Sequence, residues 1–225
     1  MPLKTIAVIR TDFQEKFGIP RQSGLANTQG RIYFEPEFQN KDCVRGLSQY
    51  SHIWLLWTFS KNQDKPWSAT VRPPRLGGNR RVGVFASRSP FRPNSIGLSS
   101  VRLDKIEIDP AHGPVLYVTG ADMLDGTPIL DIKPYLVYTD SHADAVCGYA
   151  DEVYGHALMV DFPPDLLCIV PQPQRGPLLE LLSQDPRPSY QNDPVRVYGM
   201  AYAGYQIKFT VEGGVLRVCA VTSAQ

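Results

Sequence analysis

Residues 82–136 have the sequence VGVFASRSPFRPNSIGLSSVRLDKIEIDPAHGPVLYVTGADMLDGTPILDIKPYL. The stretch contains four short segments rich in β-branched and aromatic residues: VGVFAS, IGLSSVRLDKIEI, PVLYVTGAD and PILDIKPYL. Short strands separated by proline, glycine and asparagine are typical of an antiparallel barrel or sandwich. The 20 prolines and 18 glycines among 225 residues also favour strands and turns over long helices. We therefore predict a mainly β protein.

The N-terminal part adds further strands and one long loop. KTIAVIR (residues 4–10) and RIYFEPEF (31–38) have strand-like composition. The polar stretch between them, residues 11–30, predicts a long loop, and long loops often carry function. SHIWLLWTFS (51–60) is a continuous apolar run of strand length, which predicts a strand buried on both faces.

The C-terminal part predicts a second, smaller unit. Residues 139–152 are polar and have little strand character, so we expect a linker there. GPLLELLSQD (176–185) predicts a helix that ends at DPRP, and three strands follow it. We therefore predict an N-terminal domain of residues 1–145 and a small α+β domain of residues 150–225.

Positive charge is concentrated in residues 71–103. The whole chain has a formal net charge of only +1, but this stretch holds seven arginines and no lysine, aspartate or glutamate. The planar guanidinium group matches phosphate and carboxylate oxygens and stacks on bases. The cluster therefore favours an anionic partner, either nucleic acid or a nucleotide. In the alternative interpretation, these arginines pair with backbone carbonyls or with acidic residues elsewhere in the fold.

Several classes of protein have no support in the sequence. The four cysteines lie far apart, without CxxC pairs or histidines at ligand spacing, so we expect reduced cysteines and no metal site. There is no apolar run long enough for a signal peptide or a membrane span, and we expect a cytoplasmic protein that does not enter the membrane. No GxGxxG or GxxxxGK[ST] motif indicates a Rossmann or P-loop nucleotide site.

Five segments together resemble the TrmO family, also known as YaeB-like or TsaA-like proteins. They are GIPRQSGL (18–25), HIWLLWTF (52–59), VRPPRLGGNRRVGVFASRSPFRPNSIGLS (71–99), MLDGTPILDIKPYL (123–136) and QDPRPSY (184–190). The resemblance implies a single-sheet β-barrel and a homodimer. It also implies an S-adenosylmethionine (SAM)-dependent methyltransferase that acts on tRNA, at N6 of the N6-threonylcarbamoyladenosine next to the anticodon.

The resemblance also implies a cofactor site made of loop and strand-end residues, where binding residues usually lie. Its members in this chain are Pro20, Arg21, Gln22, Ser60, Lys61, Arg88, Leu98, Leu124, Asp125, Gly126 and Thr127. We expect backbone groups of residues 20–22 and 124–127 to hydrogen-bond the adenine and the amino-acid end of the cofactor. We also expect a carboxylate such as Asp125 to lie near the positive charge of the cofactor.

Three positions depart from the family pattern. Relatives commonly have His-Gln where this chain has Ser60 and Lys61, and Val137 replaces a proline. If the family histidine makes a side-chain contact, Ser60 replaces it with a shorter one, whereas a backbone contact survives. Ser87 replaces the usual threonine before Arg88, which is a mild change.

Further residues are candidates for catalysis and RNA binding. Asp131, Lys133 and Tyr135 are candidates for orienting the acceptor, although Asp131 and Lys133 also fit a simple ion pair. We predict that RNA phosphates or the substrate carboxylate contact four arginines, Arg72, Arg75, Arg80 and Arg92. Arg187 and Tyr190 fit either a second RNA contact or a rigid helix cap. Two other functions stay open: methyl transfer to a different acceptor, and RNA or nucleotide binding without catalysis.

Overall fold

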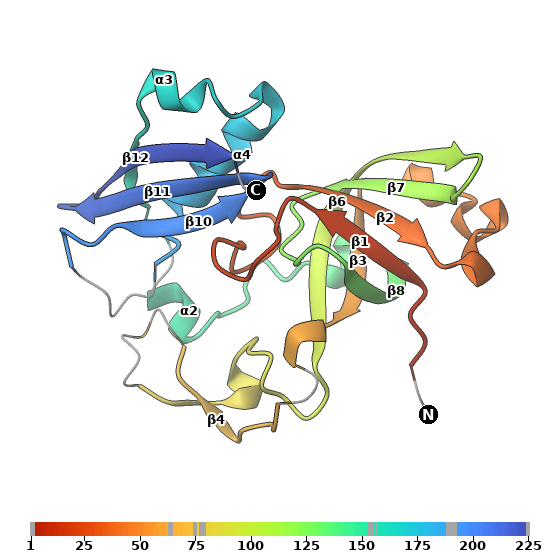
Figure 1. Cartoon of the computed structure of the whole chain (residues 1–225). Helices are drawn as coiled ribbons and strands as arrows, with labels where there is room; N and C mark the ends of the chain where they lie inside the picture. Colours follow the sequence, from red (N-terminus) through yellow and green to blue (C-terminus); the bar gives the residue numbers. More distant parts are fainter. Residues whose placement is uncertain are drawn as a thin grey trace.

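The computed structural model describes residues 3–62, 65–73, 76, 80–152, 155, 157–187 and 193–223. Six antiparallel strands close into a barrel, shown on the right of Figure 1. Their order around the barrel is β1 (Ala7–Thr11), β2 (Gln29–Phe34), β7 (Gly113–Thr119), β6 (Ile96–Asp109), β3 (His52–Thr58) and β8 (Thr127–Pro134). The predicted mainly β class with a single-sheet barrel is therefore confirmed.

Strand β3 has one buried face, so the prediction that both of its faces are buried was wrong. Ile53, Leu55 and Trp57 point into the barrel core, whereas Trp54 and Leu56 are partly exposed on the outer surface. A barrel strand has an inner and an outer face, and an apolar run alone does not separate them. Short helix α1 (Val137–Asp140) lies beside the outer face, where the Trp54 indole donates to Asp140 Oδ2 over 2.8 Å.

The segment VGVFAS is mostly not a strand. Only β5 (Val82–Gly83) is extended, and it pairs with β4 (Thr70–Val71) in a two-stranded hairpin outside the barrel. Residues Val84–Ala86 form a 3-10 turn. Proline cannot donate to a strand ladder, and Pro90 and Pro93 prevent a regular strand before β6. Further 3-10 turns in the described residues are Pro36–Phe38, Lys41–Val44, Leu47–Gln49 and Ser60–Asn62.

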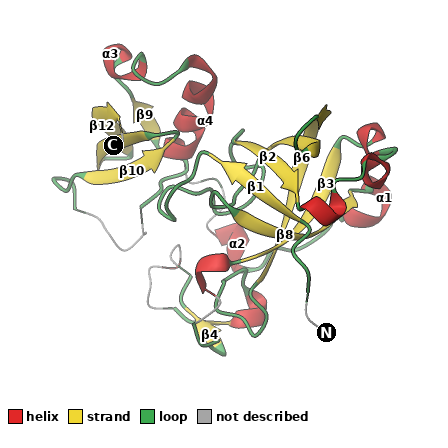
Figure 2. Ribbon diagram, turned by 45° about the vertical axis from the view of Figure 1, so that its right-hand side comes forward, coloured by secondary structure: helices red, strands yellow, loops and turns green. Residues whose placement is uncertain are grey.

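The C-terminal residues form a separate four-stranded sheet with its own core, shown beside the barrel in Figure 2. Its order is β10 (Tyr198–Tyr202), β11 (Tyr205–Glu212), β12 (Val215–Ser223) and β9 (Met159–Asp161). The sequence pattern does not predict β9, because three residues are too short for an alternation. The unit also contains the helices α3 (Pro164–Leu167) and α4 (Gln172–Ser183). Helix α2 (Tyr149–Glu152) precedes them in the chain and lies apart from this sheet in Figure 2.

Helix α4 and the sheet bury a common apolar core. Leu178, Leu181 and Leu182 of α4 are buried in it together with Phe209 and Leu216 of the sheet. This core also contains Phe13 and Ala26, which come from the long loop between β1 and β2. The loop therefore packs against both parts of the molecule. The predicted domains, residues 1–145 and 150–225, place this loop in the barrel domain because of its position in the sequence.

None of the helices in the described ranges has the length and apolar composition that a membrane-spanning helix needs. The four cysteines, Cys43, Cys147, Cys168 and Cys219, are free thiols at exposed positions.

Candidate active site

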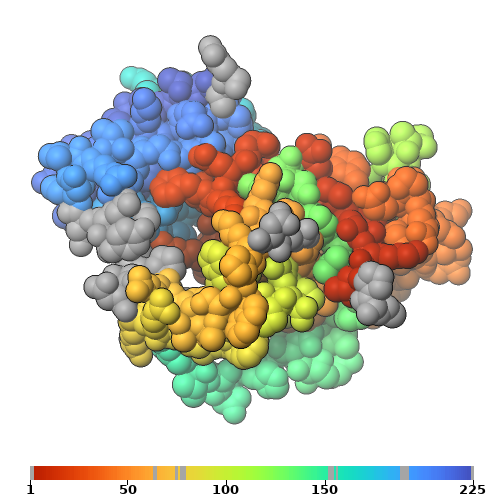
Figure 3. Space-filling view, turned by 60° about the horizontal axis from the view of Figure 1, so that its bottom comes forward, coloured from red at the N-terminus to blue at the C-terminus, as the bar shows by residue number. Residues whose placement is uncertain are grey.

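A cavity of about 450 Å³ lies where the β1–β2 loop (residues 12–28) meets one end of the barrel. It is lined by residues of four further segments: the end of β3, the turn after β5, the start of β6 and the loop between β7 and β8. In the space-filling view of Figure 3, the N-terminal residues (red) lie between the C-terminal part (blue) and the residues around position 60 and around positions 85–98 (orange to yellow-green).

The structure brings most of the predicted cofactor residues together around this cavity. Nine of the eleven line it: Pro20, Arg21, Gln22, Ser60, Lys61, Arg88, Leu98, Leu124 and Thr127. The first and last of these residues are more than 100 positions apart in the sequence, and barrel closure together with the packing of the β1–β2 loop brings them side by side. That they bind SAM stays a prediction.

The apolar wall of the cavity depends on a glycine. A Cβ atom on Gly97 would lie 2.3 Å from Cε2 of Trp57, so only glycine lets the indole ring lie against β6. Phe59 packs edge-on against this ring, with the ring centroids 4.3 Å apart. Leu98, the next residue of β6, is 52% exposed and also lines the cavity. The wall therefore offers an aromatic and aliphatic surface to a ligand.

Among the described residues, Asp122 supplies the carboxylate that lines the cavity. The Trp57 indole donates to Ser99 Oγ over 2.9 Å, and Ser99 Oγ donates to Asp122 Oδ1 over 2.6 Å. Burial raises the pKa of Asp122 to about 6, although the hydrogen bond from Ser99 and the charge of Arg88 act in the opposite direction. Ser99 therefore orients the carboxylate, and the pKa of Asp122 lies above that of an ordinary aspartate.

Asp125 does not line the cavity, although we expected it near the cofactor. Its Oδ1 accepts hydrogen bonds of 2.9 Å from Arg10 Nε and from the Thr11 backbone amide. Gly126, which follows it, has a φ of +77° in the turn before β8. These two residues shape the turn that presents Leu124 and Thr127, and Asp122 is the carboxylate at the cavity. Asp122 could not be selected from the sequence, because no local motif marks it.

The arginines of residues 71–103 have different surroundings. Arg88 Nη1 donates to Gln22 Oε1 across the cavity, which joins two predicted cofactor segments. Arg92 lines the cavity, and its guanidinium donates to the backbone carbonyls of Ser87 over 2.8 Å and Ser89 over 3.4 Å. Arg92 therefore holds the turn that carries Arg88, as in the alternative interpretation of the cluster. Arg72 and Arg80 are exposed.

The predicted second RNA contact has less support. Arg187 is only 8% exposed, and its Nε donates to Asp185 Oδ1 over 2.9 Å. Its guanidinium also lies over the Tyr198 ring, 5.7 Å from the centroid. These contacts favour the rigid-cap interpretation for Arg187. Arg75 and Tyr190 lie outside the described residues.

Lys16 and Asn62 also line the cavity, although the sequence analysis did not select them. Lys16 Nζ donates to Oδ1 of the buried Asn62 over 2.8 Å. Burial, with smaller effects from the charges of Lys65 and Lys61, lowers the pKa of Lys16. Basic side chains are numerous in the described lining of the cavity, which includes Lys16, Arg21, Lys61, Arg88 and Arg92.

The three candidates for orienting the acceptor lie away from the cavity lining. Asp131 and Lys133 form an exposed ion pair over 2.9 Å on β8, and the Tyr135 ring packs beside Trp54 with centroids 5.5 Å apart. The register between β3 and β8 shifts next to Trp57, so that Ile129 and Ile132 both contact the core. This bulge turns Asp131 and Lys133 to the outer face. Their part in catalysis stays a prediction.

Within the described residues, no group of three histidine, cysteine, aspartate or glutamate side chains is placed to hold a metal ion. The positioned groups are a carboxylate, several cations, backbone groups of two loops and an aromatic wall.

Two family models match the chain, one over the barrel and one over the C-terminal part. Residues 8–141 match the N-terminal domain of tRNA-methyltransferase O, and residues 171–224 match the TrmO C-terminal domain. The chain therefore belongs to the tRNA-methyltransferase O family.

Individual relatives are similar over nearly the whole length. The chain is 37% identical to a tRNA (adenine(37)-N6)-methyltransferase of Escherichia coli, over 96% of this chain and 95% of the relative. It is 44% identical to a putative S-adenosylmethionine-dependent methyltransferase, RcsF, of Pseudomonas aeruginosa, over 87% of this chain and 86% of the relative. A crystal structure of TrmO from P. aeruginosa superposes with a TM-score of 0.80 at 35% identity, covering 99% of this chain and 97% of the other.

Proposed function

We propose that this protein methylates tRNA, transferring the methyl group of SAM to N6 of the adenosine at position 37, and that its substrate carries the N6-threonylcarbamoyl group. The convergence of the predicted cofactor residues on one cavity of about 450 Å³ carries the proposal. The similarity to relatives named for methylation of N6 of adenine 37 supports the reaction, and the one named as an S-adenosylmethionine-dependent methyltransferase supports the cofactor.

The residues around the cavity fit the chemistry of SAM. The cofactor has an adenine ring, an ammonium group, a carboxylate and a positively charged sulfonium. Trp57, Phe59 and Leu98 supply apolar surface for the ring and the thioether region. Asp122 would neutralise positive charge, and Arg88 would pair with the carboxylate.

Catalysis by this arrangement would depend on alignment and electrostatics. Bound SAM supplies an electrophilic methyl group, and S-adenosylhomocysteine is the product. The acceptor nitrogen is a urea-type N–H, which becomes a good nucleophile as its proton is lost. The new bond from this nitrogen to the methyl carbon would replace the bond from the methyl carbon to sulfur, and the proton would pass to solvent. The positive charges of Lys16 and Arg21 at the cavity would stabilise the developing negative charge. Correct orientation of the two reactants contributes several kcal/mol more, on the order of the effective-molarity effects known for intramolecular reactions.

A single assay separates this function from the two alternatives. The protein is incubated with methyl-labelled SAM and with tRNA that carries or lacks the threonylcarbamoyl group, and the nucleosides are analysed by mass. We expect a methylated product only with the modified tRNA. Methylation of unmodified tRNA or of a small molecule would support a different acceptor. Salt-dependent tRNA binding without product would support a binding protein.

The variant Arg88→Ala tests the site itself. We expect it to weaken SAM binding by more than tenfold, because it removes both a charge and the contact to Gln22. The proposed homodimer is tested separately, by sedimentation of the purified protein.

A further inference from the structure

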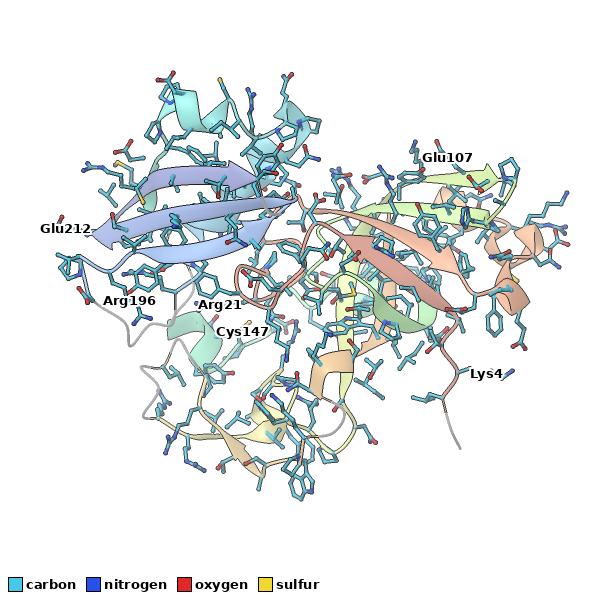
Figure 4. All side chains as sticks on the ribbon, viewed as in Figure 1. Lys4, Arg21, Glu107, Cys147, Arg196 and Glu212 are labelled. Carbon is cyan, nitrogen blue, oxygen red and sulfur yellow. The ribbon has the colours of Figure 1, made fainter. Side chains whose placement is uncertain are left out.

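The β1–β2 loop forms one wall of the cavity through Ile19, Pro20, Arg21 and Gln22. Its middle residues are not part of a helix or a strand, so they depend on neighbours for their position. In Figure 4, Arg21 lies where the C-terminal sheet and the barrel meet. The contacts of the loop with the C-terminal part therefore bear directly on the cavity.

Both ends of the loop are attached to the C-terminal part. At its start, Phe13 is buried against Tyr202, with the ring centroids 5.6 Å apart, and the Ala203 amide donates to the Asp12 carbonyl over 3.0 Å. Near its end, the Glu180 carboxylate of α4 accepts from the Asn27 amide over 2.6 Å and from Asn27 Nδ2 over 2.8 Å. Hydrogen bonds to a carboxylate are stronger than neutral ones.

The middle of the loop is attached as well. Arg21 Nη2 donates to the carbonyls of Asp185, over 3.1 Å, and Arg187, over 2.9 Å. Gly18 has a φ of +93°, and a Cβ atom there would lie 2.3 Å from Met200 Sδ. The backbone of the loop therefore passes directly over the side chain of Met200 in β10.

The barrel supplies the other side of the attachment. The Gly24 amide donates to the Gly120 carbonyl over 3.0 Å, and Thr28 Oγ1 donates to the Ala121 carbonyl over 2.5 Å. Gly120 and Ala121 directly precede Asp122. The loop is thus held between the β7–β8 connection of the barrel and the α4–β10 region of the C-terminal part.

We infer that the C-terminal domain positions the cofactor-binding wall of the cavity, and that Glu180 is a positioning residue for SAM binding. The inference rests on the proposed function for the identity of the ligand. Glu180 does not line the cavity, so its effect would pass through Asn27 and the loop backbone. Removing its carboxylate would loosen the end of the loop near Asn27, while the other attachments remain. Affinity falls in proportion to the fraction of molecules that hold the binding-competent arrangement.

The test compares Glu180→Ala with Glu212→Ala in the full-length protein. Glu212 is an exposed glutamate at the far end of β11, on the outer side of the C-terminal sheet (Figure 4). It is therefore a matched control for losing one carboxylate from the same domain. Amide hydrogen exchange of residues 12–28 reports on the loop, and calorimetric titration with SAM in the absence of tRNA reports on the site.

We expect Glu180→Ala to accelerate exchange in the loop and to raise the Kd for SAM about tenfold, on the scale of losing charge-assisted hydrogen bonds. At saturating SAM the kcat should stay within about twofold, since bound ligand restores the loop. Glu212→Ala should change neither quantity. Faster exchange without weaker binding, or unchanged exchange, would overturn the inference.

Two further variants cover the case in which Glu180→Ala does not fold. Asn27→Ala leaves α4 intact and removes one of the two hydrogen bonds, so we expect a rise in Kd of about threefold. Glu180→Gln keeps an acceptor oxygen and should restore part of the affinity. If the wild-type protein does not bind SAM, the proposed function fails, while the exchange data still decide whether the C-terminal domain holds the loop.

Discussion

The hydroxyl of Ser99 lies 2.6 Å from Oδ1 of Asp122, and it is itself held by the Trp57 indole at 2.9 Å. Ser99 is on β6, Trp57 on β3, and Asp122 in the loop before β8, so three segments of the barrel fix the orientation of one carboxylate. Asp122 faces the cavity that we propose for SAM. This arrangement predicts a pH dependence.

We expect SAM binding to weaken below pH 6. Burial raises the pKa of Asp122 from 3.8 to about 6, so the carboxyl is ionised above this pH and protonated below it. A cation binds the ionised form, and the Kd should rise about tenfold per pH unit below pH 6. Calorimetric titration between pH 5 and 8 measures this slope. Asp122→Asn should bind weakly at every pH, and a wild-type slope in this variant would assign the titration to another group.

Gly97→Ala tests the aromatic wall. The new methyl group would overlap the Trp57 ring, so we expect a loss of about 2–3 kcal/mol in the free energy of unfolding and weak SAM binding. Urea denaturation followed by tryptophan fluorescence measures the stability. Gly199→Ala is the control, because a Cβ on this strand glycine has nothing within 4 Å. Equal stability of the two variants would show that Trp57 moves without cost.

Arg92 and Arg72 should have separable effects. Arg92→Ala removes the donor to the carbonyls of the 84–89 turn, so we expect a Kd for SAM raised about fivefold. Arg72 is exposed, and Arg72→Ala should leave SAM binding unchanged while the slope of log tRNA affinity against log salt decreases by about 1. Titrations with SAM and with tRNA measure both effects. If Arg92→Ala changes only the affinity for tRNA, Arg92 contacts RNA and does not support the SAM site.

The Asp131–Lys133 pair should contribute little to the apo protein. Both side chains are exposed, and we expect Asp131→Asn to change the free energy of unfolding by less than about 1 kcal/mol. The Kd for SAM should stay within about twofold, because neither side chain lines the cavity. A tenfold weaker Kd would contradict this placement. A lower kcat with an unchanged Kd would support the predicted role in orienting the acceptor.

Local composition was enough to predict the mainly β class, most of the barrel strands, helix α4 and the strands that follow it. These elements have clear signals: alternating or continuous apolar runs, turn residues between them, and leucines at helical spacing. Strand β9 has three residues and no such signal, and VGVFAS has strand-like composition but mostly forms a turn. Resemblance to the TrmO family located nine residues of the cavity lining, because its motifs are long.

The placement of individual side chains depends on contacts between distant segments. Asp122 and Asp125 are three residues apart in the same loop, yet the first faces the cavity and the second bonds Arg10 and Thr11. Glu180 lies in no recognisable motif, and 153 positions in the sequence separate it from its hydrogen-bond partner Asn27. Residue type and spacing determined the elements and the family. Which charges meet at the cavity follows from barrel closure and from packing of the β1–β2 loop against the C-terminal core, because burial and hydrogen bonding depend on neighbours that are remote in the chain.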